Sequence, residues 1–373
     1  MSDRPIRVAH IIGKWIGGGV ESVVMNYYRN INKNVFQFDF LCDSDSTNIP
    51  YEEINKLGGR VILIPPYQKL IKYEKTLVKI FKDNKYNIVH SHINVLSVFS
   101  LRAAKKAGVP IRIAHSHSTT NKNELAKNLI KQVLRPFSKV YATDYFCCGE
   151  LAGRWLFGNK TYDEGKVFLL YNAIDLDKFK FNNEIRISKR KELNLDNESF
   201  AIGHIGRFVR QKNHSFLLNI FKTINDIDTN AKLVLAGEGP LLDSIKDEAK
   251  LLGISDNVIF LGQRKDANEL YQAFDAFVMP SLYEGLPVVG VEAQASDLPC
   301  FFSTTITKEI SITNNCNFLS LNDDYKMWAL EIEKVKKFNR KDISEELIDS
   351  NFNIKHTVSL LEHKYTCLLG KIK

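Results

Sequence analysis

The chain has 373 residues, of which 44% are hydrophobic and 25% are charged, with a formal net charge of +8. This is the composition of a soluble globular protein, and the length exceeds what one hydrophobic core usually serves, so we expect two domains of similar size. No uninterrupted apolar run approaches the ~18 residues that span a bilayer. Residues 1–19 also lack a secretory hydrophobic region. We therefore expect a cytoplasmic protein.

The positive charge is concentrated in the first half of the chain. Residues 1–182 hold 27 Lys and Arg against 16 Asp and Glu, whereas the remainder holds 24 against 27. A basic half suits a polyanion or an anionic membrane surface, and a lysine-rich exterior without a partner is the other interpretation. We expect no nucleic-acid partner, because the sequence has neither a known binding motif nor a basic surface interleaved with aromatic residues.

The six cysteines do not indicate a metal site. Most of them sit in apolar, strand-like runs, and none has metal-ligand spacing. We expect reduced, buried thiols. The six are Cys42, Cys147, Cys148, Cys300, Cys316 and Cys367.

Apolar strand-like runs alternate with amphipathic helical stretches along the chain. Nearly continuous apolar strands separated by helices predict a parallel sheet that is covered on both faces. A polar connection interrupts the pattern, which then restarts, so one α/β architecture is used twice. The runs cover residues 7–12, 38–42, 60–65, 88–92, 111–117, 145–149 and 167–172, and then 200–207, 232–239, 258–262, 276–280, 299–303 and 317–321.

Domain boundaries follow from this repetition. We expect an N-terminal domain over residues 1–182, a C-terminal domain over residues 183–345, and a helix over residues 346–373 that packs back on the body. Ligands of such sheets bind beyond the carboxyl ends of the strands, and two facing sheets would form a cleft.

Residues 277–295 are the most informative stretch. An apolar run ends at Pro280, a small-residue loop follows, and Pro287 opens a segment of helical character. Amides at such a helix start bind anions, while Glu284 and Glu292 suit sugar or ribose hydroxyls. The stretch predicts a site for a phosphorylated, hydroxyl-rich ligand. The alternative is an ordinary turn with one solvated glutamate and one helix-start glutamate.

Glycine-containing loops follow other predicted strands. Arg207 and Lys212 stand five residues apart in one such loop, well placed to hold a diphosphate. Residues 236–240 and 260–266 form two more such turns at the same edge of the predicted sheet. In the first half, residues 17–19 are three glycines that precede an amphipathic helix, either as a loop that approaches a ligand or as a plain tight turn.

Four histidines lie at the ends of two predicted strands. His90 and His92 end one strand and His115 and His117 end another, and each pair shares a face because strand side chains two apart point the same way. Hydrogen bonding to a ligand or acid and base chemistry is one interpretation, and structural bonding at the strand ends is another. Metal binding fits less well, because no carboxylate or cysteine accompanies the histidines.

Residues 122–139 have helical character. Their leucine, isoleucine and valine side chains fall on one stripe, with basic residues largely off it. Such a stripe is usually a core contact, and its basic flank also suits an interfacial helix near lipid headgroups.

Together these motifs resemble the retaining glycosyltransferases of family 4. The paired glutamates within PSLYEGLPVVGVEAQA are specific, whereas glycine loops alone are not. The resemblance covers nearly the whole length and implies the GT-B fold, an α/β protein with two Rossmann-like domains whose parallel sheets face each other across a cleft. Ala173 departs from the pattern, where glycine is common. The matching segments are the glycine loop at 17–19, YNAID at 171–175, GRF at 206–208 with Lys212 downstream, AGEGP at 236–240, and Glu284 with Glu292.

The resemblance also implies roles for individual residues. Arg207 and Lys212 would hold the donor diphosphate together with the amides of residues 285–288. Glu284 would bind the donor sugar, and Glu292 would bind the ribose hydroxyls. A histidine after the strand would lie beside the sugar, with His117 preferred to His115. The implied catalytic residues are Arg207, Lys212, Glu284 and His117. The implied donor-binding residues are Gly18, Gly19, Gly239, Gln263, Gly285, Leu286, Pro287, Val288 and Glu292.

The resulting hypothesis is transfer of a sugar, with retention, from a nucleoside diphosphate sugar to a hydroxyl of a glycan or lipid-linked acceptor. We expect a UDP-sugar as co-substrate, no further cofactor and no metal, since no Asp-x-Asp motif is positioned to hold one. Segments GGGVES and HSHSTTN are similar to those of enzymes of bacterial capsular or exopolysaccharide synthesis. The basic first half would then contact the inner face of the plasma membrane.

Two other functions remain open from the sequence. A nucleotide-sugar epimerase on the same double-Rossmann plan would also use carboxylates in the cleft. A non-catalytic protein that binds a nucleotide sugar or a glycan for another enzyme is the second alternative, and the pairing of two cations with two glutamates argues against it.

Overall fold

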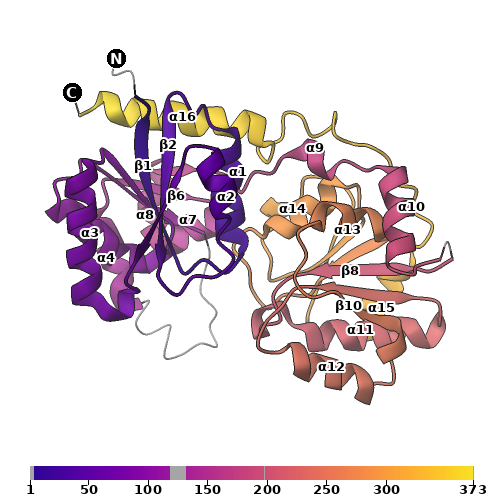
Figure 1. The fold of residues 1–373 in the computed structure, drawn as a ribbon. Coiled ribbons are helices and arrows are strands. Elements are labelled where there is room, and N and C mark those ends of the chain that lie inside the picture. Colours follow the sequence, from indigo (N-terminus) through magenta and orange to yellow (C-terminus); the bar gives the residue numbers. More distant parts are fainter. Residues whose placement is uncertain (1–3, 118–131, 197, 373) are drawn as a thin grey trace. The chain divides into compact units, whose positions relative to one another are not determined.

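The computed structural model of the chain describes residues 4–117, 132–196 and 198–372 (Figure 1). Each of the predicted apolar runs forms a strand within these ranges, and all strand pairings are parallel. The chain divides into a first unit, Met1–Ala173 with Asn351–Lys373, and a second unit, Ile174–Ser350. Each unit is built on one sheet, as the repetition in the sequence predicts.

The first unit holds a sheet in the order β3-β2-β1-β4-β5-β6-β7. The order reverses between β1 and β4, the switch point at which Rossmann-like sheets bind ligands. The strands are β1 (Ile6–Gly13), β2 (Phe36–Asp43), β3 (Arg60–Ile64), β4 (Ile88–Ser91), β5 (Ile111–Ser116), β6 (Asp144–Cys147) and β7 (Val167–Leu169). The helices are α1 (Gly19–Asn30), α2 (Tyr51–Lys56), α3 (Leu70–Asn84), α4 (Ser97–Lys106), α6 (Ser138–Tyr141), α7 (Glu150–Phe157), α8 (Asn159–Asp163) and α16 (Ile354–Gly370).

The second unit repeats the plan with the order β10-β9-β8-β11-β12-β13. Its switch point lies between β8 and β11. The strands are β8 (Ala201–Ile205), β9 (Lys232–Ala236), β10 (Val258–Phe260), β11 (Ala276–Met279), β12 (Cys300–Ser303) and β13 (Cys316–Leu319). The helices are α9 (Leu176–Phe179), α10 (Asn183–Glu192), α11 (His214–Ile227), α12 (Leu242–Leu251), α13 (Ala267–Ala273), α14 (Val288–Ala295) and α15 (Tyr325–Glu333).

Burial explains why these strands read as continuous apolar runs. Every residue of β2, β4, β11 and β12 is buried, because helices cover both faces of each sheet. In the second unit, α11 buries Leu217, Leu218 and Phe221 against a core that includes residues of β8, β9 and β11. The predicted α/β class with two doubly covered parallel sheets is confirmed.

Helix α16 belongs to the first unit although it follows the second unit in the chain. The ring of Tyr365 packs edge-on against Phe36 with ring centroids 5.5 Å apart, and its hydroxyl lies 2.7 Å from Nδ1 of His90. The chain therefore returns to the first unit at Asn351, whereas the sequence placed the last boundary at residues 345 and 346.

The first boundary also differs from the one expected after residue 182. Residues 174–182 belong to the second unit, because α9 packs on α13 and α14. The carbonyl oxygen of Phe179 accepts a hydrogen bond from Ser296 Oγ at 2.6 Å. A polar connection in the sequence indicates that one domain ends and another begins. Only the packing contacts of the connection show to which domain its residues belong.

None of the six cysteines, all of which lie in the described ranges, forms a disulfide, and Cys42, Cys147, Cys148 and Cys300 are buried. Cys367, on α16, is exposed and corrects the expectation of burial. Among the described residues, no helix combines the length and the hydropathy needed to cross a bilayer.

The helix predicted at 122–139 falls largely on residues 118–131, which lie outside the described residues. Of the predicted stripe, Val133 is exposed, so its predicted core contact is wrong, whereas Leu134 is half-buried and packs against the core of the first unit. Phe137 and Val140, which follow the stripe, are exposed as well.

Candidate active site

The two loops at the switch point of the second unit are joined by hydrogen bonds. The loop after β8 carries the short 3-10 helix Arg210–Lys212, and the loop after β11 carries Glu284. Leu282 N donates to the carbonyl oxygen of Gln211 at 2.8 Å, and Gln211 Nε2 donates to the carbonyl oxygen of Tyr283 at 3.0 Å. Each loop therefore fixes the conformation of the other.

An ion pair connects the same loops through their side chains. Lys212 Nζ lies 2.7 Å from Glu284 Oε1, and the two side chains are only 14% and 8% exposed. Gln211 Nε2 donates to the second carboxylate oxygen, Oε2, at 2.9 Å. Both oxygens of Glu284 are thus engaged, whereas the ammonium group of Lys212 has three N–H donors and uses one of them on this carboxylate.

Glycines explain how the loops after β8 and β9 come so close together. A Cβ on Gly237 would stand 2.0 Å from the carbonyl oxygen of Gly206, and a Cβ on Gly239 would stand 2.5 Å from that of Phe208. Any larger residue would separate the two loops. Gly239, predicted as a donor-binding residue, therefore has a packing role in the backbone.

Arg207 lies in the loop after β8, and its side chain is exposed. The predicted partner of Lys212 is thus at the same sheet edge, and the structure records no ion pair for it within the described ranges. A Cβ on Gly206, one residue earlier, would meet Lys212 Cε at 3.3 Å. Glycine at this position leaves room for the stem of the lysine.

Glu292 lies on α14 and contacts Tyr271. The phenol hydroxyl donates to Glu292 Oε2 at 2.9 Å. Burial raises the pKa of Glu292 to about 7, although the hydrogen bond from Tyr271 opposes that rise. The sequence predicted the glutamate but not the tyrosine that holds it.

Residues 285–288, whose amides are predicted to hold the donor diphosphate, lie at the start of α14. The helix begins at Val288, directly after Pro287, and Leu286, Pro287 and Val288 are buried while Gly285 is half-buried. The position of the proline just before the helix agrees with its missing N–H. Gln263 is exposed in the loop after β10, at the same edge of the sheet.

In the first unit, the glycine loop forms the start of α1. Gly18 is the residue before the helix, Gly19 is its first residue, and Gly17 has the left-handed φ of 79°. Ile16 N donates to Glu21 Oε1 at 3.0 Å, which ties the loop to the first turn of the helix. The loop therefore has a defined turn conformation at the carboxyl end of β1.

The histidines form a larger group than the sequence indicated. His90, His92, His115 and His117 are all buried and are joined by His10 of β1, which the sequence analysis missed. His10 lies opposite His90 in the register of β1 and β4, so the pairing of two distant strands creates the cluster. His117 lies just past the end of β5, and Asn94 Oδ1 accepts a hydrogen bond from its backbone N at 2.8 Å.

Two triplets of this cluster have nitrogen atoms within 4.8 Å of one another, His10 with His90 and His92, and His92 with His115 and His117. The rings of His90 and His92 stack with centroids 4.2 Å apart and an angle of 24°. Lone pairs of imidazoles lie in the ring plane, so stacked rings do not direct them to one point. At His90 and His92 the geometry therefore suits hydrogen bonding better than tetrahedral ligation.

A small pocket of about 150 Å³ lies in the first unit beside the ends of β1 and β2. Lys14, Asp43 and Asp45 contribute to its wall. Lys14 Nζ pairs with Asp45 Oδ2 at 2.7 Å, while burial and the neighbouring Asp45 raise the pKa of Asp43 to about 6. Asp43 and Asp45 have the Asp-x-Asp spacing that the sequence analysis did not regard as positioned to hold a metal.

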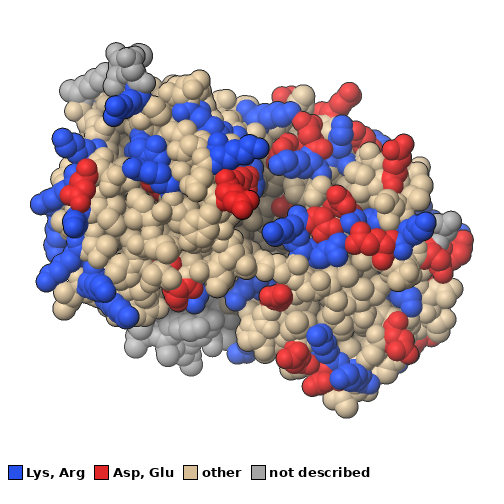
Figure 2. All heavy atoms as spheres, viewed as in Figure 1, with Lys and Arg blue, Asp and Glu red and all other residues tan. Residues whose placement is uncertain are grey.

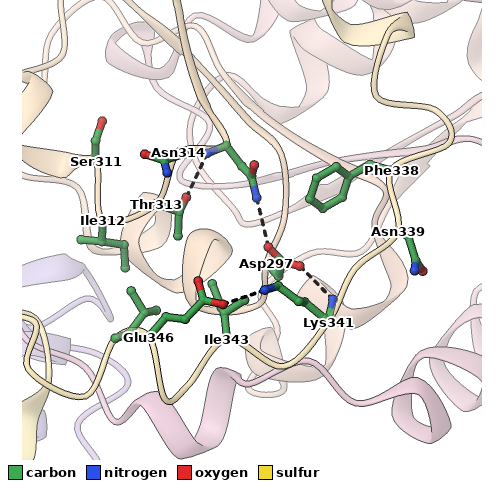
Figure 3. A pocket seen from close by; sticks show the side chains of 12 residues that line it. Asp297, Ser311, Ile312, Thr313, Asn314, Phe338, Asn339, Lys341, Ile343 and Glu346 are labelled. Carbon is green, nitrogen blue, oxygen red and sulfur yellow. Dashed lines mark hydrogen bonds and ion pairs between the residues drawn. The ribbon is translucent and has the colours of Figure 1, made fainter.

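A larger pocket of about 650 Å³ lies elsewhere in the second unit (Figure 3). Asp297 accepts hydrogen bonds there from Asn315 Nδ2 and from the backbone N of Lys341, and Lys341 also pairs with Glu346. None of the predicted site residues lines it. Cavity size therefore does not identify the site in this unit.

Comparison with known proteins gives two family matches. Residues 185–348 match the model of glycosyl transferases group 1, and residues 17–178 match the model of glycosyltransferase family 4. The chain is 36% identical to EpsF of Bacillus subtilis, named as a glycosyltransferase, over 98% of this chain and 97% of that protein. It is 26% identical to the Escherichia coli UDP-Gal:alpha-D-GlcNAc-diphosphoundecaprenol alpha-1,3-galactosyltransferase, over 85% of each chain.

Solved structures show the same fold. The crystal structure of Anabaena HepE with UDP and glucose superposes with a TM-score of 0.81 at 14% identity, covering 97% of this chain and 99% of that one. The sequence similarity to EpsF and the two family matches decide the assignment, and the fold agrees with it. The chain belongs to the group 1, family 4 glycosyltransferases of GT-B fold.

Proposed function

We propose that this glycosyltransferase moves a sugar from a UDP-sugar to a hydroxyl of a glycan or lipid-linked acceptor in polysaccharide biosynthesis, with retention at the anomeric carbon. The observation that carries the proposal is the ion pair of Lys212 with Glu284 at the switch point of the second sheet. The relative from Escherichia coli is named for a UDP-linked donor and a diphosphoundecaprenol acceptor, and HepE was crystallised with UDP-glucose.

The donor diphosphate is held by Lys212 and Arg207 together with the amides of residues 285–288. Breaking the bond to the sugar leaves negative charge on the diphosphate and an oxocarbenium-like sugar. Fixed cations and helix-start amides stabilise that charge more as it develops, which lowers the barrier. In the free protein, Glu284 orients Lys212 toward the site of the diphosphate. In the complex, it accepts hydrogen bonds from hydroxyls of the donor sugar.

We assign the other roles from the family pattern. Glu292 accepts ribose hydroxyls, and Gln263 and Gly239 border the donor in the second unit. In the first unit, Gly18 and Gly19 approach the reacting sugar, and His117 hydrogen-bonds a sugar hydroxyl. The pocket at Lys14, Asp43 and Asp45 takes part of the acceptor, since carboxylates accept hydrogen bonds from sugar hydroxyls.

The direct test is a mass-spectrometric screen of the purified protein for UDP release across a panel of donors, with lipid-linked and soluble glycan acceptors. We expect one donor to give UDP and a lengthened acceptor with retained configuration, at a rate that EDTA does not change. Epimerised donor in the absence of acceptor would instead support an epimerase. Tight UDP binding with no product would support a non-catalytic partner, and turnover abolished by EDTA and restored by a divalent ion would exclude the metal-independent mechanism.

Replacing Lys212 with alanine should lower kcat at least tenfold and change KM less, because the lost charge-assisted hydrogen bond contributes about 1.5 to 3 kcal/mol chiefly in the transition state. Steady-state kinetics with the donor identified in the screen measure both constants. The matched control is Lys222→Ala, which removes a lysine paired with Asp226 on the exposed side of α11 and should leave both constants unchanged. Equal kinetics in the Lys212 and Lys222 variants would remove Lys212 from the mechanism.

UDP should bind more tightly as the pH rises from 6 to 8. The pKa of Glu292 is about 7, so its carboxylate is mostly protonated at pH 6 and mostly ionised at pH 8, and only the ionised form accepts both ribose hydroxyls. We expect about a tenfold change in Kd by calorimetry. Glu292→Gln is the control, since it retains only the pH dependence that comes from UDP itself; an equal dependence in both proteins would contradict the ribose role.

We also propose peripheral contact of the first unit with an anionic membrane. On the face shown in Figure 2, Lys and Arg side chains gather along the first unit where α3 and α4 lie. Val133, Phe137 and Val140 expose 60%, 48% and 53% of their surface near α6, which packs on α4. Basic residues near anionic lipid contribute about 1 kcal/mol each, and apolar side chains add to this by insertion. The exposed lysines of α3 are Lys72, Lys75, Lys79 and Lys82.

Sedimentation with vesicles tests this contact. We expect binding to phosphatidylglycerol vesicles that weakens with salt, little binding to phosphatidylcholine vesicles, and a several-fold loss in a Phe137→Ser, Val140→Ser variant. Ile227→Ser is the control, because it removes an exposed apolar side chain of the second unit. Equal binding of both variants, or no binding at low salt, would argue against the proposed surface.

A further inference from the structure

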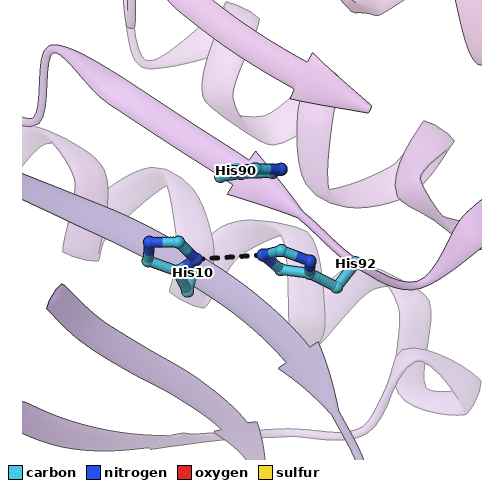
Figure 4. Close-up of side chains that lie close together, drawn as sticks. All are labelled: His10, His90 and His92. Atoms are coloured by element: carbon cyan, nitrogen blue, oxygen red, sulfur yellow. Dashed lines mark hydrogen bonds between the residues drawn. The ribbon is translucent and has the colours of Figure 1, made fainter. Parts of the chain in front are cut away.

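The buried histidines of the first unit form two hydrogen-bonded chains. In the longer chain, His10 Nδ1 lies 2.9 Å from His92 Nε2, and His92 Nδ1 lies 2.9 Å from His117 Nε2. Figure 4 shows the first of these links, between β1 and the end of β4. In the shorter chain, the hydroxyl of Tyr365 meets His90 Nδ1 at 2.7 Å, and His90 Nε2 lies 3.0 Å from His115 Nδ1.

Burial keeps the longer chain neutral. It lowers the pKa of His10 and of His117 to about 3, and it lowers that of His92 well below the ordinary value, with neighbouring histidines adding to the effect. Each neutral imidazole carries one N–H and one lone pair. Three rings linked from Nδ1 to Nε2 therefore have two arrangements only, with all protons on Nδ1 or all on Nε2.

The two arrangements differ at the ends of the chain. His10 Nε2 and His117 Nδ1 are buried and have no hydrogen-bond partner among the described residues. With protons on Nε2, the His10 N–H would point without an acceptor into a site where its ring lies 3.9 Å from that of Phe38. With protons on Nδ1, the N–H without a partner is instead that of His117, which lies just past the end of β5, at the edge of the sheet where ligands bind. A ligand can supply the missing acceptor at that edge but not beside Phe38, so protons on Nδ1 are favoured. The Nδ1–H of His117 then has no acceptor among the described residues.

We propose that His10 and His92 are positioning residues that fix the tautomer of His117, so that its Nδ1–H donates a hydrogen bond to a substrate oxygen. The proposal rests on the proposed function for the role of His117. It adds that His117 is the donor in its hydrogen bond to the substrate. A group that only accepts hydrogen bonds, such as a phosphate oxygen, fits this N–H, and so does the oxygen of a sugar hydroxyl. A metal ion at the cluster would have to break the links between the rings.

The first experiment reads the tautomers directly by nitrogen-15 NMR of histidine-labelled full-length protein at pH 7, without substrate. Each signal is assigned from a variant in which one histidine is replaced. We expect His10, His92 and His117 to be protonated at Nδ1. Protonation at Nε2 in any of the three, a mixture, or stoichiometric binding of added Zn²⁺ at these rings would overturn the proposal. Because this measurement needs no turnover, it can succeed or fail independently of the proposed transferase activity.

The second experiment changes the far end of the chain. His10→Leu removes the donor to His92, whereas His10→Asn keeps an amide N–H at a similar place. We expect His117 to lose its single tautomer and kcat/KM to fall about tenfold in His10→Leu, with both largely restored in His10→Asn. Should His10→Leu fail to fold, the NMR of the wild-type protein and of His10→Asn still decides; an unchanged His117 tautomer in a folded His10→Leu variant would refute the linkage.

Discussion

The proposed chemistry depends on one ion pair, Lys212 with Glu284, which bridges two loops that are 72 residues apart in the chain. It exists because β8 and β11 are neighbours at the point where the strand order of the second sheet reverses. Each loop leaves its strand at the same edge, and the two side chains meet there with little exposure to water. Such a pair holds a cation in place before any ligand arrives, so less ordering remains to be done on binding.

Close packing of the backbone supports this arrangement. The loops after β8 and β9 approach each other so tightly that only glycine fits at residues 237 and 239. In the sequence these glycines indicate ligand-binding loops. In the structure they allow the two loops to pack closely together. By this packing they also influence the position of the loop that carries Arg207 and Lys212.

Strand positions could be predicted because a doubly covered parallel strand has to be apolar throughout. The placement of Glu284 and Lys212 in loops and of Glu292 in a helix could be predicted, because a strand, a loop and a helix follow one another closely in both segments. The contacts of His10, Gln211, Tyr271 and Tyr365 could not be predicted, because each is an isolated polar residue whose partner lies in a distant strand, loop or helix. Tyr365 is the extreme case, since its partner His90 is 275 residues away.

The central claim is that Lys212 holds the diphosphate that leaves with the nucleotide, while Glu292 holds the ribose. Phosphorus-31 NMR of UDP titrated with the protein tests it most directly, because the β-phosphate resonance reports the cation that contacts it. The account predicts a shifted β-phosphate signal in the wild-type protein and in Glu292→Gln at saturating protein, and a signal close to that of free UDP in Lys212→Ala even when the nucleotide is bound. A β-phosphate signal of bound UDP that is the same in Lys212→Ala as in the wild-type protein would contradict it.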